Sequence, residues 1–296
     1  MSEQSSANNK KVAVVTGANK GIGYHVALQL TMCNQFRHVI LTCSDETRGL
    51  TARKLLLESA TDSAPGSIAT VTYLPLEVGN PASHQEFRRI LEEKFDGKLD
   101  VLVNNAAIAF HESDPTPYAE QTKPLLNVNF RGTVDLTEVL LPLLRKSSDA
   151  RIVNITGRLG RLDQLTSKEF RDRFSSPTLT MTELRSLVDE YEEDVNDNAS
   201  KEKGWGESSN GMSKLALIAA TKILAREEAA NGIKVNCCCP GEVGRHAHWW
   251  CDTDMSNYTG HKPPAEGAKN AVLLATMKRD DCPTGEFYQN MERSEW

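Results

Sequence analysis

The feature of this sequence that most limits its fold is the order of its first thirty residues. Residues 11–16 are apolar enough for a strand that is buried on both faces. Gly17, Gly21 and Gly23 follow, and apolar residues then recur at the three- and four-residue spacing of a helix. A strand, a glycine turn and a helix in this order predict the first half of a βαβ unit.

The same alternation continues along the chain. Helices are expected at about 82–95, 121–145, 211–231 and 264–278, and further strands at 38–43, 69–76, 99–104, 151–156, 233–239 and 286–288. Strands that alternate with helices predict a parallel sheet covered by helices on both faces. We therefore predict a single Rossmann-type, doubly wound α/β domain over residues 11–296, preceded by a polar, disordered tail at 1–10.

Two segments interrupt this pattern. The segment at about 160–206 is charged and partly helical, and its apolar residues show helical spacing over 181–195. The segment at about 241–262 contains Trp249 and Trp250. Both follow the carboxyl ends of predicted strands, where open α/β sheets bind ligands. We interpret the first as a helical insertion and the second as a substrate loop, while surface elaboration or packing onto the sheet remains an alternative for each.

Composition excludes several classes of function. The net charge is −6 over 296 residues, which argues against nucleic acid or an anionic membrane as the main partner. No run of eighteen apolar residues is present, and the N-terminus lacks the apolar core of a signal peptide, so we expect a cytoplasmic protein.

The seven cysteines include no C-x-x-C pair, so they predict neither a disulfide framework nor a zinc site. The run from Cys237 to Cys239 closes an apolar stretch, and we expect it to pack in the core. A group of His246, His248, Cys251, Asp252 and Asp254 matches no standard metal spacing, and we predict no metal.

The glycines carry the first chemical signal. Glycine between a strand and a helix lets the backbone approach a pyrophosphate, and the helix N-terminus supplies N–H groups and positive potential. The spacing here is G-x-x-x-G-x-G rather than G-x-G-x-x-G, so glycines that merely turn the chain remain the alternative interpretation.

Several motifs together resemble a known family. They are TGANKGIG at 16–23, Asn104-Asn105-Ala106-Ala107 after the fourth strand, Asn129 within a helix, and Pro240-Gly241 after the sixth strand. In this order they resemble the short-chain dehydrogenase/reductase family. The stretches LDVLVNNAAIAF, DPTPY, NFRGT and LLPLL, and the long insertion, are similar to the monomeric NADPH-dependent carbonyl reductases of that family.

The resemblance implies hydride transfer from a nicotinamide to a carbonyl, assisted by a tyrosine, a lysine, a serine and an asparagine. Asn129 matches the asparagine, and Lys214 matches the lysine that contacts the nicotinamide ribose. The tyrosine position, four residues before that lysine, holds Asn210, and the serine position holds Gly157. Two of the four expected catalytic groups are therefore missing.

A neutral amide has no proton to release near neutral pH, so Asn210 does not replace the tyrosine as an acid. Water or Lys214 would serve only as a poor acid, and we expect weak carbonyl reduction. The alternative is a catalytically inactive NADP(H)-binding protein that acts as a sensor or scaffold. A sequence altered from an active parent is a third interpretation.

The resemblance also implies which residues hold the cofactor. Lys20 matches the residue that meets a 2′-phosphate, while Ser44 stands where NAD users carry an acid and NADP users an arginine, with Arg48 nearby. NADP(H) is therefore expected over NAD(H), and the alternative is that Lys20 is a solvated surface charge. The whole cofactor-binding set is Gly17, Asn19, Lys20, Gly21, Ile22, Gly23, Ser44, Arg48, Glu77, Asn105, Lys214, Pro240 and Gly241.

The expected partner is a small carbonyl substrate. The insertion resembles the one that covers a helix face used for tetramerisation elsewhere in the family, so we expect a monomer.

Overall fold

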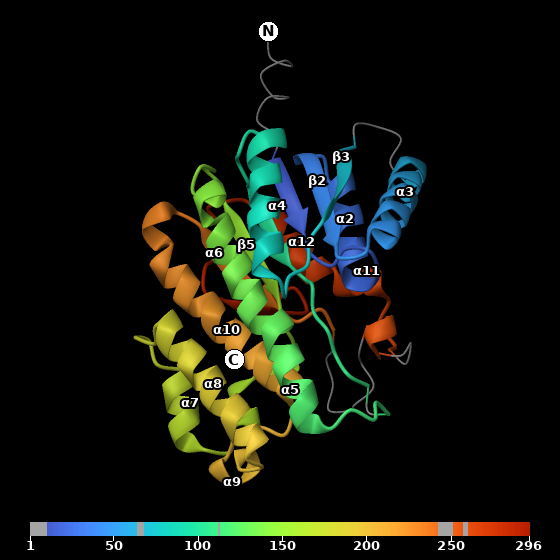
Figure 1. The fold of residues 1–296 in the computed structure, drawn as a ribbon. Helices are drawn as coiled ribbons and strands as arrows, with labels where there is room; N and C mark the ends of the chain where they lie inside the picture. Colours follow the sequence, from blue (N-terminus) through green and yellow to red (C-terminus); the bar gives the residue numbers. More distant parts are fainter. Residues whose placement is uncertain (1–10, 64–67, 112, 242–250, 257–259) are drawn as a thin grey trace.

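The computed structural model describes residues 11–63, 68–111, 113–241, 251–256 and 260–296. Within them one sheet has the order β3-β2-β1-β4-β5-β6-β7-β8, in which β1 to β7 are parallel and β8 is antiparallel to β7 (Figure 1). The strands are β1 (Lys11–Val15), β2 (Phe36–Cys43), β3 (Thr70–Pro75), β4 (Val101–Asn104), β5 (Arg151–Ile155), β6 (Lys234–Cys238), β7 (Phe287–Gln289) and β8 (Glu292–Ser294). The predicted doubly wound α/β fold is confirmed.

Helices cover both faces of the sheet. One layer contains α2 (Gly21–Met32), α3 (Glu46–Ser63), α11 (Pro264–Gly267) and α12 (Lys269–Thr276). The other contains α4 (Pro81–Lys94), α6 (Thr133–Leu144) and α10 (Ser209–Glu227). The separate hydrophobic core beneath each layer explains why the strands read as continuous apolar runs rather than as alternating ones.

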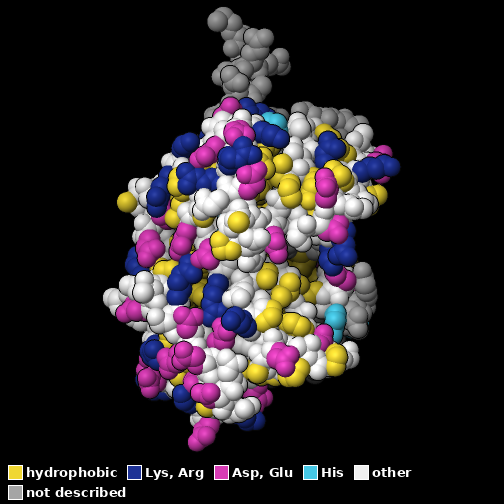
Figure 2. Space-filling view, in the orientation of Figure 1, with side chains coloured by type: hydrophobic (Ala, Val, Ile, Leu, Met, Phe, Trp, Pro, Cys, Tyr) yellow, Lys and Arg dark blue, Asp and Glu magenta, His cyan; other side chains and the backbone are white. Residues whose placement is uncertain are grey.

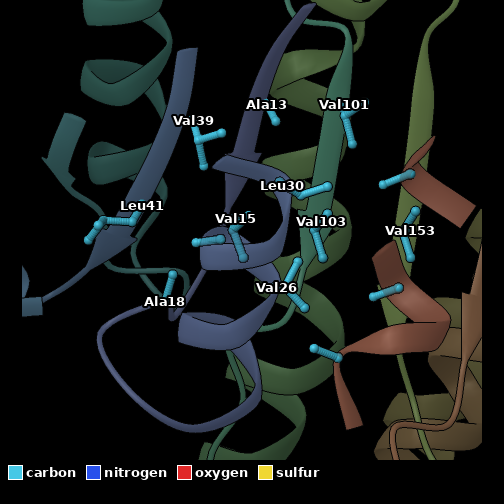
Figure 3. Close-up of a cluster of buried hydrophobic side chains, with 14 of the residues drawn as sticks. Ala13, Val15, Ala18, Val26, Leu30, Val39, Leu41, Val101, Val103 and Val153 are labelled. Carbon is cyan, nitrogen blue, oxygen red and sulfur yellow. The ribbon is translucent and has the colours of Figure 1, made fainter. Parts of the chain in front are cut away.

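Strand β1 shows how a single run serves both cores. Ala13 and Val15 point into the core under α2, whereas Val12 and Val14 point into the core under α4 and α6, because successive side chains alternate across a strand. Figure 3 shows Val15 among side chains from α2, β2 and β4. Burying each valine or leucine contributes about 1.5–3 kcal/mol.

The helix predicted over 121–145 is in fact three pieces. Helix α5 (Tyr118–Leu126) leads into a π-helical turn, η1 (Asn127–Gly132), and only then into α6. At the end of the turn, Gly132 lies so close to Val78 that a Cβ there would be 2.1 Å from the Val78 carbonyl oxygen. The π turn carries Asn129, and such turns often occur at functional sites.

Two further differences concern boundaries and missed elements. The helix expected at 264–278 is divided between α11 and α12 and ends at Thr276. Helix α3 and the edge strand β8 were not expected from the pattern. Residues 1–10 lie outside the described residues.

The chain between β5 and α10 builds a smaller core at the carboxyl end of the sheet. It begins with the short turns η2 (Arg158–Gly160) and η3 (Leu162–Gln164), followed by α7 (Lys168–Phe174), α8 (Met181–Asn196) and α9 (Ser200–Lys203). Helix α8 packs on α5 and α10 (Figure 1). At the centre of this core Trp205 stacks on Phe170 and donates from Nε1 to Asp194 at 2.7 Å.

The cysteine run at the end of β6 is buried, as the sequence predicted. Cys237, Cys238 and Cys239 are 1%, 0% and 3% exposed. Among the described residues, no helix combines the length and the apolar character needed to cross a bilayer.

Candidate active site

The glycine turn between β1 and α2 is built for close backbone approach. Gly17 has φ +61°, and a Cβ there would lie 2.8 Å from the Cα of Ala106. A Cβ on Gly23 would lie 2.3 Å from the side-chain nitrogen of Asn105 and 2.6 Å from the carbonyl oxygen of Gly17. These positions therefore leave no room for a side chain, and the turn presents backbone toward a ligand.

The N-terminus of α2 is open to an anion. Lys20 occupies the capping position in an extended conformation, no side chain in the described part of the chain caps the helix, and its first turn contains no acidic residue. The first N–H groups of a helix need an acceptor and carry positive potential. This end of α2, at the β1–β4 switch point of the sheet, fits the pyrophosphate of a dinucleotide.

Asn105 holds this turn in place. Its side-chain nitrogen donates to the carbonyl oxygens of Thr16 at 2.8 Å and Gly17 at 3.0 Å. The Thr16 hydroxyl in turn accepts from the backbone N–H groups of Asn105 and Ala106, each at 3.0 Å. The amide of Asn105 thus ties the end of β4 to the glycine turn.

The residues predicted on the adenosine side are exposed. Ser44 and Glu77 follow the carboxyl ends of β2 and β3, and Glu77 accepts from the side chain of Asn80 at 3.2 Å. Arg48 lies on the first turn of α3, and its backbone N–H donates to Asp45 at 2.7 Å. Asn19 and Ile22, within the glycine turn, are partly buried.

Lys20 and Asp254 form an ion pair that sequence reasoning did not predict. Asp254 begins the short turn η5 (Asp254–Ser256), and its neighbour Thr253 rests on the glycine turn, 3.2 Å from where a Cβ of Gly21 would be. A segment 234 positions further along the chain thus lies against the predicted phosphate site. Local sequence around either residue carries no signal for such a contact.

Asn129 is fully engaged with the backbone of a neighbouring segment. Its side-chain oxygen accepts from the N–H of Ile108 at 2.8 Å, and its nitrogen donates to the Ile108 carbonyl at 3.0 Å. The same nitrogen lies 3.2 Å from the hydroxyl of Ser213. The asparagine therefore ties the segment after β4 to both the π turn and α10.

Lys214 and Asn210 lie one turn apart on α10. The Nζ of Lys214 donates to the carbonyl oxygen of Ile155 at 3.3 Å, at the end of β5. Burial lowers the pKa of Lys214 to about 8, because a desolvated ammonium is less stable than the neutral amine. The turn η2 packs tightly here: a Cβ on Gly160 would lie 2.9 Å from the Cβ of Lys214.

Gly157 leaves open space at the end of β5. Its backbone is extended, at φ −177° and ψ 162°, and no atom of the described ranges lies within 4 Å of where its Cβ would be. A serine fits this position without displacing any neighbour. The end of β5 therefore has more room than in a chain with a side chain at this position.

Three nearby hydroxyls have partners within the protein. Thr156 donates to the Cys238 carbonyl at 3.2 Å, and Ser213 donates to the Asn210 carbonyl at 2.7 Å. The hydroxyl of Ser209 lies 2.6 Å from that of Thr122. These contacts provide no reason to assign any of the three as a substitute for the missing tyrosine or serine.

A chain of phenols ends beside the tyrosine position and was missed from sequence. The hydroxyl of Tyr118 is 2.7 Å from that of Tyr191, which is 3.1 Å from the hydroxyl of Ser209. Burial raises the pKa of Tyr191, so this phenol stays protonated. Because Tyr191 comes from the insertion, only the packing of α8 on α5 and α10 brings these groups together.

Pro240 and Gly241 follow β6 and are the last residues before the undescribed range 242–250. The carbonyl of the preceding Cys239 accepts from Asn270 at 2.8 Å, and the carbonyl of Pro240 lies 3.5 Å from the thiol of Cys251. The predicted loop residues Trp249, Trp250, His246 and His248 lie outside the described residues.

An apolar segment follows β4 next to these groups. Residues 106–110 read Ala-Ala-Ile-Ala-Phe, and each is partly buried. Figure 2 shows hydrophobic side chains gathered beside a hollow on the face where Figure 1 places the segment between β4 and α5. This end of the sheet thus offers apolar surface close to the Asn129–Ile108 contact.

Comparison with known proteins identifies the family. The family profile described as short chain dehydrogenase matches residues 11–167, more than half of the chain. The chain belongs to the short-chain dehydrogenase family. The glycine turn, Asn129 and Lys214 of this short-chain dehydrogenase lie at the carboxyl edge of its sheet.

Relatives match along almost the whole length. Carbonyl reductase (NADPH) 1 from Mus musculus is 36% identical over 298 residues, which cover 98% of this chain and all of that protein. The Homo sapiens protein of the same name is 35% identical and covers 96% of this chain and 98% of its own length. The solved structure of salutaridine reductase from Papaver somniferum is 29% identical, covers 95% of this chain and all of that one, and superposes with a TM-score of 0.81.

Proposed function

We propose that this short-chain dehydrogenase is an NADPH-dependent carbonyl reductase with slow turnover. The observation that carries the proposal is the uncapped N-terminus of α2 behind a glycine turn, with Lys20 beside it. When bound, NADPH supplies a hydride, and the chain must then hold the dinucleotide, seat the carbonyl and provide a proton. The names of the mouse and human relatives support this cofactor and this substrate class.

The cofactor preference is proposed to depend on Lys20. An ammonium beside the ribose attracts the 2′-phosphate of NADPH, and Ser44 places no carboxylate where an NAD-specific protein would have one. Lys20→Ala should raise the Kd for NADPH about tenfold, because a charge-assisted contact of about 1.5 kcal/mol is lost. The Kd for NADH should stay unchanged. Lys54→Ala, at an exposed position on α3, is the matched control.

The substrate is proposed to be a small apolar ketone, aldehyde or quinone. The partly buried segment 106–110 provides an apolar wall, and Leu159, which is 41% exposed, follows Gly157. Apolar walls with few polar groups are typical of small-molecule sites.

The second candidate function is NADP(H) binding without useful turnover, as a sensor or scaffold. The identities of Asn210 and Gly157 favour it, because neither supplies an acid or a hydroxyl at the position that the family uses. A positioned general acid contributes about 10²- to 10⁴-fold in rate, and an oxyanion donor about 10²- to 10³-fold.

One pair of measurements separates the two functions. NADPH is titrated by fluorescence quenching, and its oxidation is then followed by absorbance in the presence of an aromatic dicarbonyl. Binding with slow oxidation supports the reductase, and binding without oxidation supports the sensor. Failure to bind NADPH contradicts both.

We further propose that residues 11–296 form one domain that works as a cytoplasmic monomer, with an insertion at about 160–206 and a substrate loop at about 241–262. The packing of α8 on α5 and α10 supports the monomer, since it covers helix surface that another subunit would need. The seven cysteines form no disulfide with one another, in keeping with a reducing compartment.

A further inference from the structure

We propose that Lys214 is itself the proton donor of this reductase and gives its proton directly to the carbonyl oxygen of the substrate. The inference rests on the proposed function and assigns to the lysine a role different from the one implied by the family resemblance. Four observations at the junction of β5 and α10 carry it.

The first observation is the room beside the lysine. Where the resemblance implies a serine and a tyrosine, the chain has Gly157 and Asn210, and no atom of the described residues lies within 4 Å of a Cβ placed on Gly157. Asn210 is one helical turn before Lys214, so both side chains emerge on the same side of α10. Neither residue has the side chain that the resemblance implies at its position, so a carbonyl group here meets no serine hydroxyl and no phenol from positions 157 and 210.

The second observation is the direction of the lysine side chain. Its Nζ reaches the carbonyl oxygen of Ile155, two residues before Gly157. The ammonium therefore lies at the end of β5, beside the backbone that leads to Gly157. One of its three N–H groups contacts Ile155, which leaves others to donate to a substrate oxygen.

The third observation is the electrostatic surroundings of the ammonium. In the described part of the chain, the other titratable group that influences the pKa of Lys214 is Cys239, at the end of β6, which raises that pKa only in its thiolate form. On its own helix the neighbours Asn210 and Ser213 are uncharged, and Arg158 on η2 is exposed to solvent. Among these residues no carboxylate pairs with Lys214, so its acidity follows from desolvation.

The fourth observation is the resulting pKa of about 8, which suits an acid at neutral pH. An ordinary lysine, with a pKa near 10.4, would hold its proton too tightly to be an effective acid there. At neutral pH most Lys214 side chains remain protonated and ready to donate. Buried lysines commonly acquire such catalytic pKa values through the loss of water.

The proposed reaction is a hydride transfer to carbon followed by a proton transfer to oxygen. The carbonyl carbon of the substrate accepts the hydride that NADPH provides, and the electron pair of the carbonyl π bond moves onto oxygen. That oxygen takes a proton from the ammonium of Lys214, which forms the alcohol and leaves a neutral amine. The amine recovers its proton from water before the next turnover.

The test is the pH dependence of kcat in the intact protein. A donor must be protonated, so kcat should be constant below pH 8 and fall tenfold per pH unit well above it. Lys214→Arg keeps the positive charge near the ribose but has no accessible neutral form, so it should lower kcat about 10²-fold and remove the pH limb. Lys222→Arg, two turns later on α10 and exposed to solvent, is the matched control and should behave as the wild type.

Each outcome decides something. A fall in kcat above about pH 8 that is absent from Lys214→Arg, while that variant still binds NADPH, supports the proposal. An unchanged profile in Lys214→Arg overturns the role of Lys214 while the reductase function stands. NADPH binding without any oxidation overturns the donor and favours the sensor. If Lys214→Arg does not fold, Lys214→Gln is measured in its place, with thermal unfolding and NADPH binding as checks.

Discussion

The glycine turn before α2 and the open end of β5 occupy the same edge of the sheet, yet they respond to an added carbon in opposite ways. At Gly23 a Cβ would lie 2.3 Å from a neighbouring atom, whereas at Gly157 it would meet no described atom within 4 Å. The first region is defined by close backbone contacts, so a side chain added at Gly23 would overlap its neighbours. The second is defined by side chains, and two of its expected groups are absent. We therefore expect changes in the first region to affect cofactor binding and changes at Gly157 and Asn210 to affect turnover.

The largest expected effect comes from rebuilding the open region. The double variant Asn210→Tyr, Gly157→Ser should raise kcat about 10²-fold, because it supplies both a phenol and an oxyanion donor. Steady-state NADPH oxidation measures this, and Asn210→Tyr alone should recover part of the gain. The Kd for NADPH should not change.

An exposed asparagine provides the control for this rebuilding. Asn196→Tyr, at the end of α8, adds the same phenol away from the site and should leave kcat unchanged. No gain in the double variant would show that Asn210 and Gly157 are not the tyrosine and serine positions.

A smaller effect is expected on the free energy of unfolding, which should differ between glycine-to-alanine variants of the two regions. Gly23→Ala should lower the free energy of unfolding by about 1–3 kcal/mol, because the added carbon overlaps Asn105 and the Gly17 carbonyl. Gly157→Ala should change it by less than about 1 kcal/mol, and in the stabilising direction, since an extended backbone suits alanine and the unfolded chain loses freedom. Urea unfolding of the two variants tests the comparison, and equal losses would contradict it.

The smallest expected effect concerns the ion pair on the glycine turn. Asp254 competes with a 2′-phosphate for Lys20, so Asp254→Asn should lower the Kd for NADPH up to about fivefold, the equivalent of an exposed ion pair of at most about 1 kcal/mol. The Kd for NADH should stay the same. Glu58→Gln, which removes an exposed carboxylate from α3, controls for net charge. A weaker affinity for NADPH in Asp254→Asn would show that Asp254 assists rather than competes.

Much of the fold could be predicted from sequence because parallel strands buried on both faces produce continuous apolar runs. The strand predicted at 151–156 agrees with β5 to within one residue. The π turn at Asn127–Gly132 could not be predicted, because it preserves the apolar spacing of a long helix and arises from the close approach of Gly132 to Val78. Helix α3 lacked a clear apolar stripe, since exposed Leu50 and Leu55 interrupt it.

In the candidate site, too, some residues were assigned from the sequence and others were missed. Motif spacing assigned Asn129, Lys214 and the glycine turn, since each lies at a fixed offset from its strand or helix. The phenols of Tyr118 and Tyr191 were missed, because 73 residues separate them and only packing joins them. Asn105 was expected to bind the cofactor, and the structure adds that its amide holds the glycine turn.

The amino-acid sequence alone determined the alternation that forms the sheet and the presence of Asn210 and Gly157 where the family resemblance implies a tyrosine and a serine, because these are properties of local pattern and residue identity. Tertiary structure decided the open space at Gly157, the desolvation of Lys214 and the pairing of Lys20 with Asp254. Each of these depends on distances between segments far apart along the chain, and those distances are set only when the two layers of helices pack on the sheet.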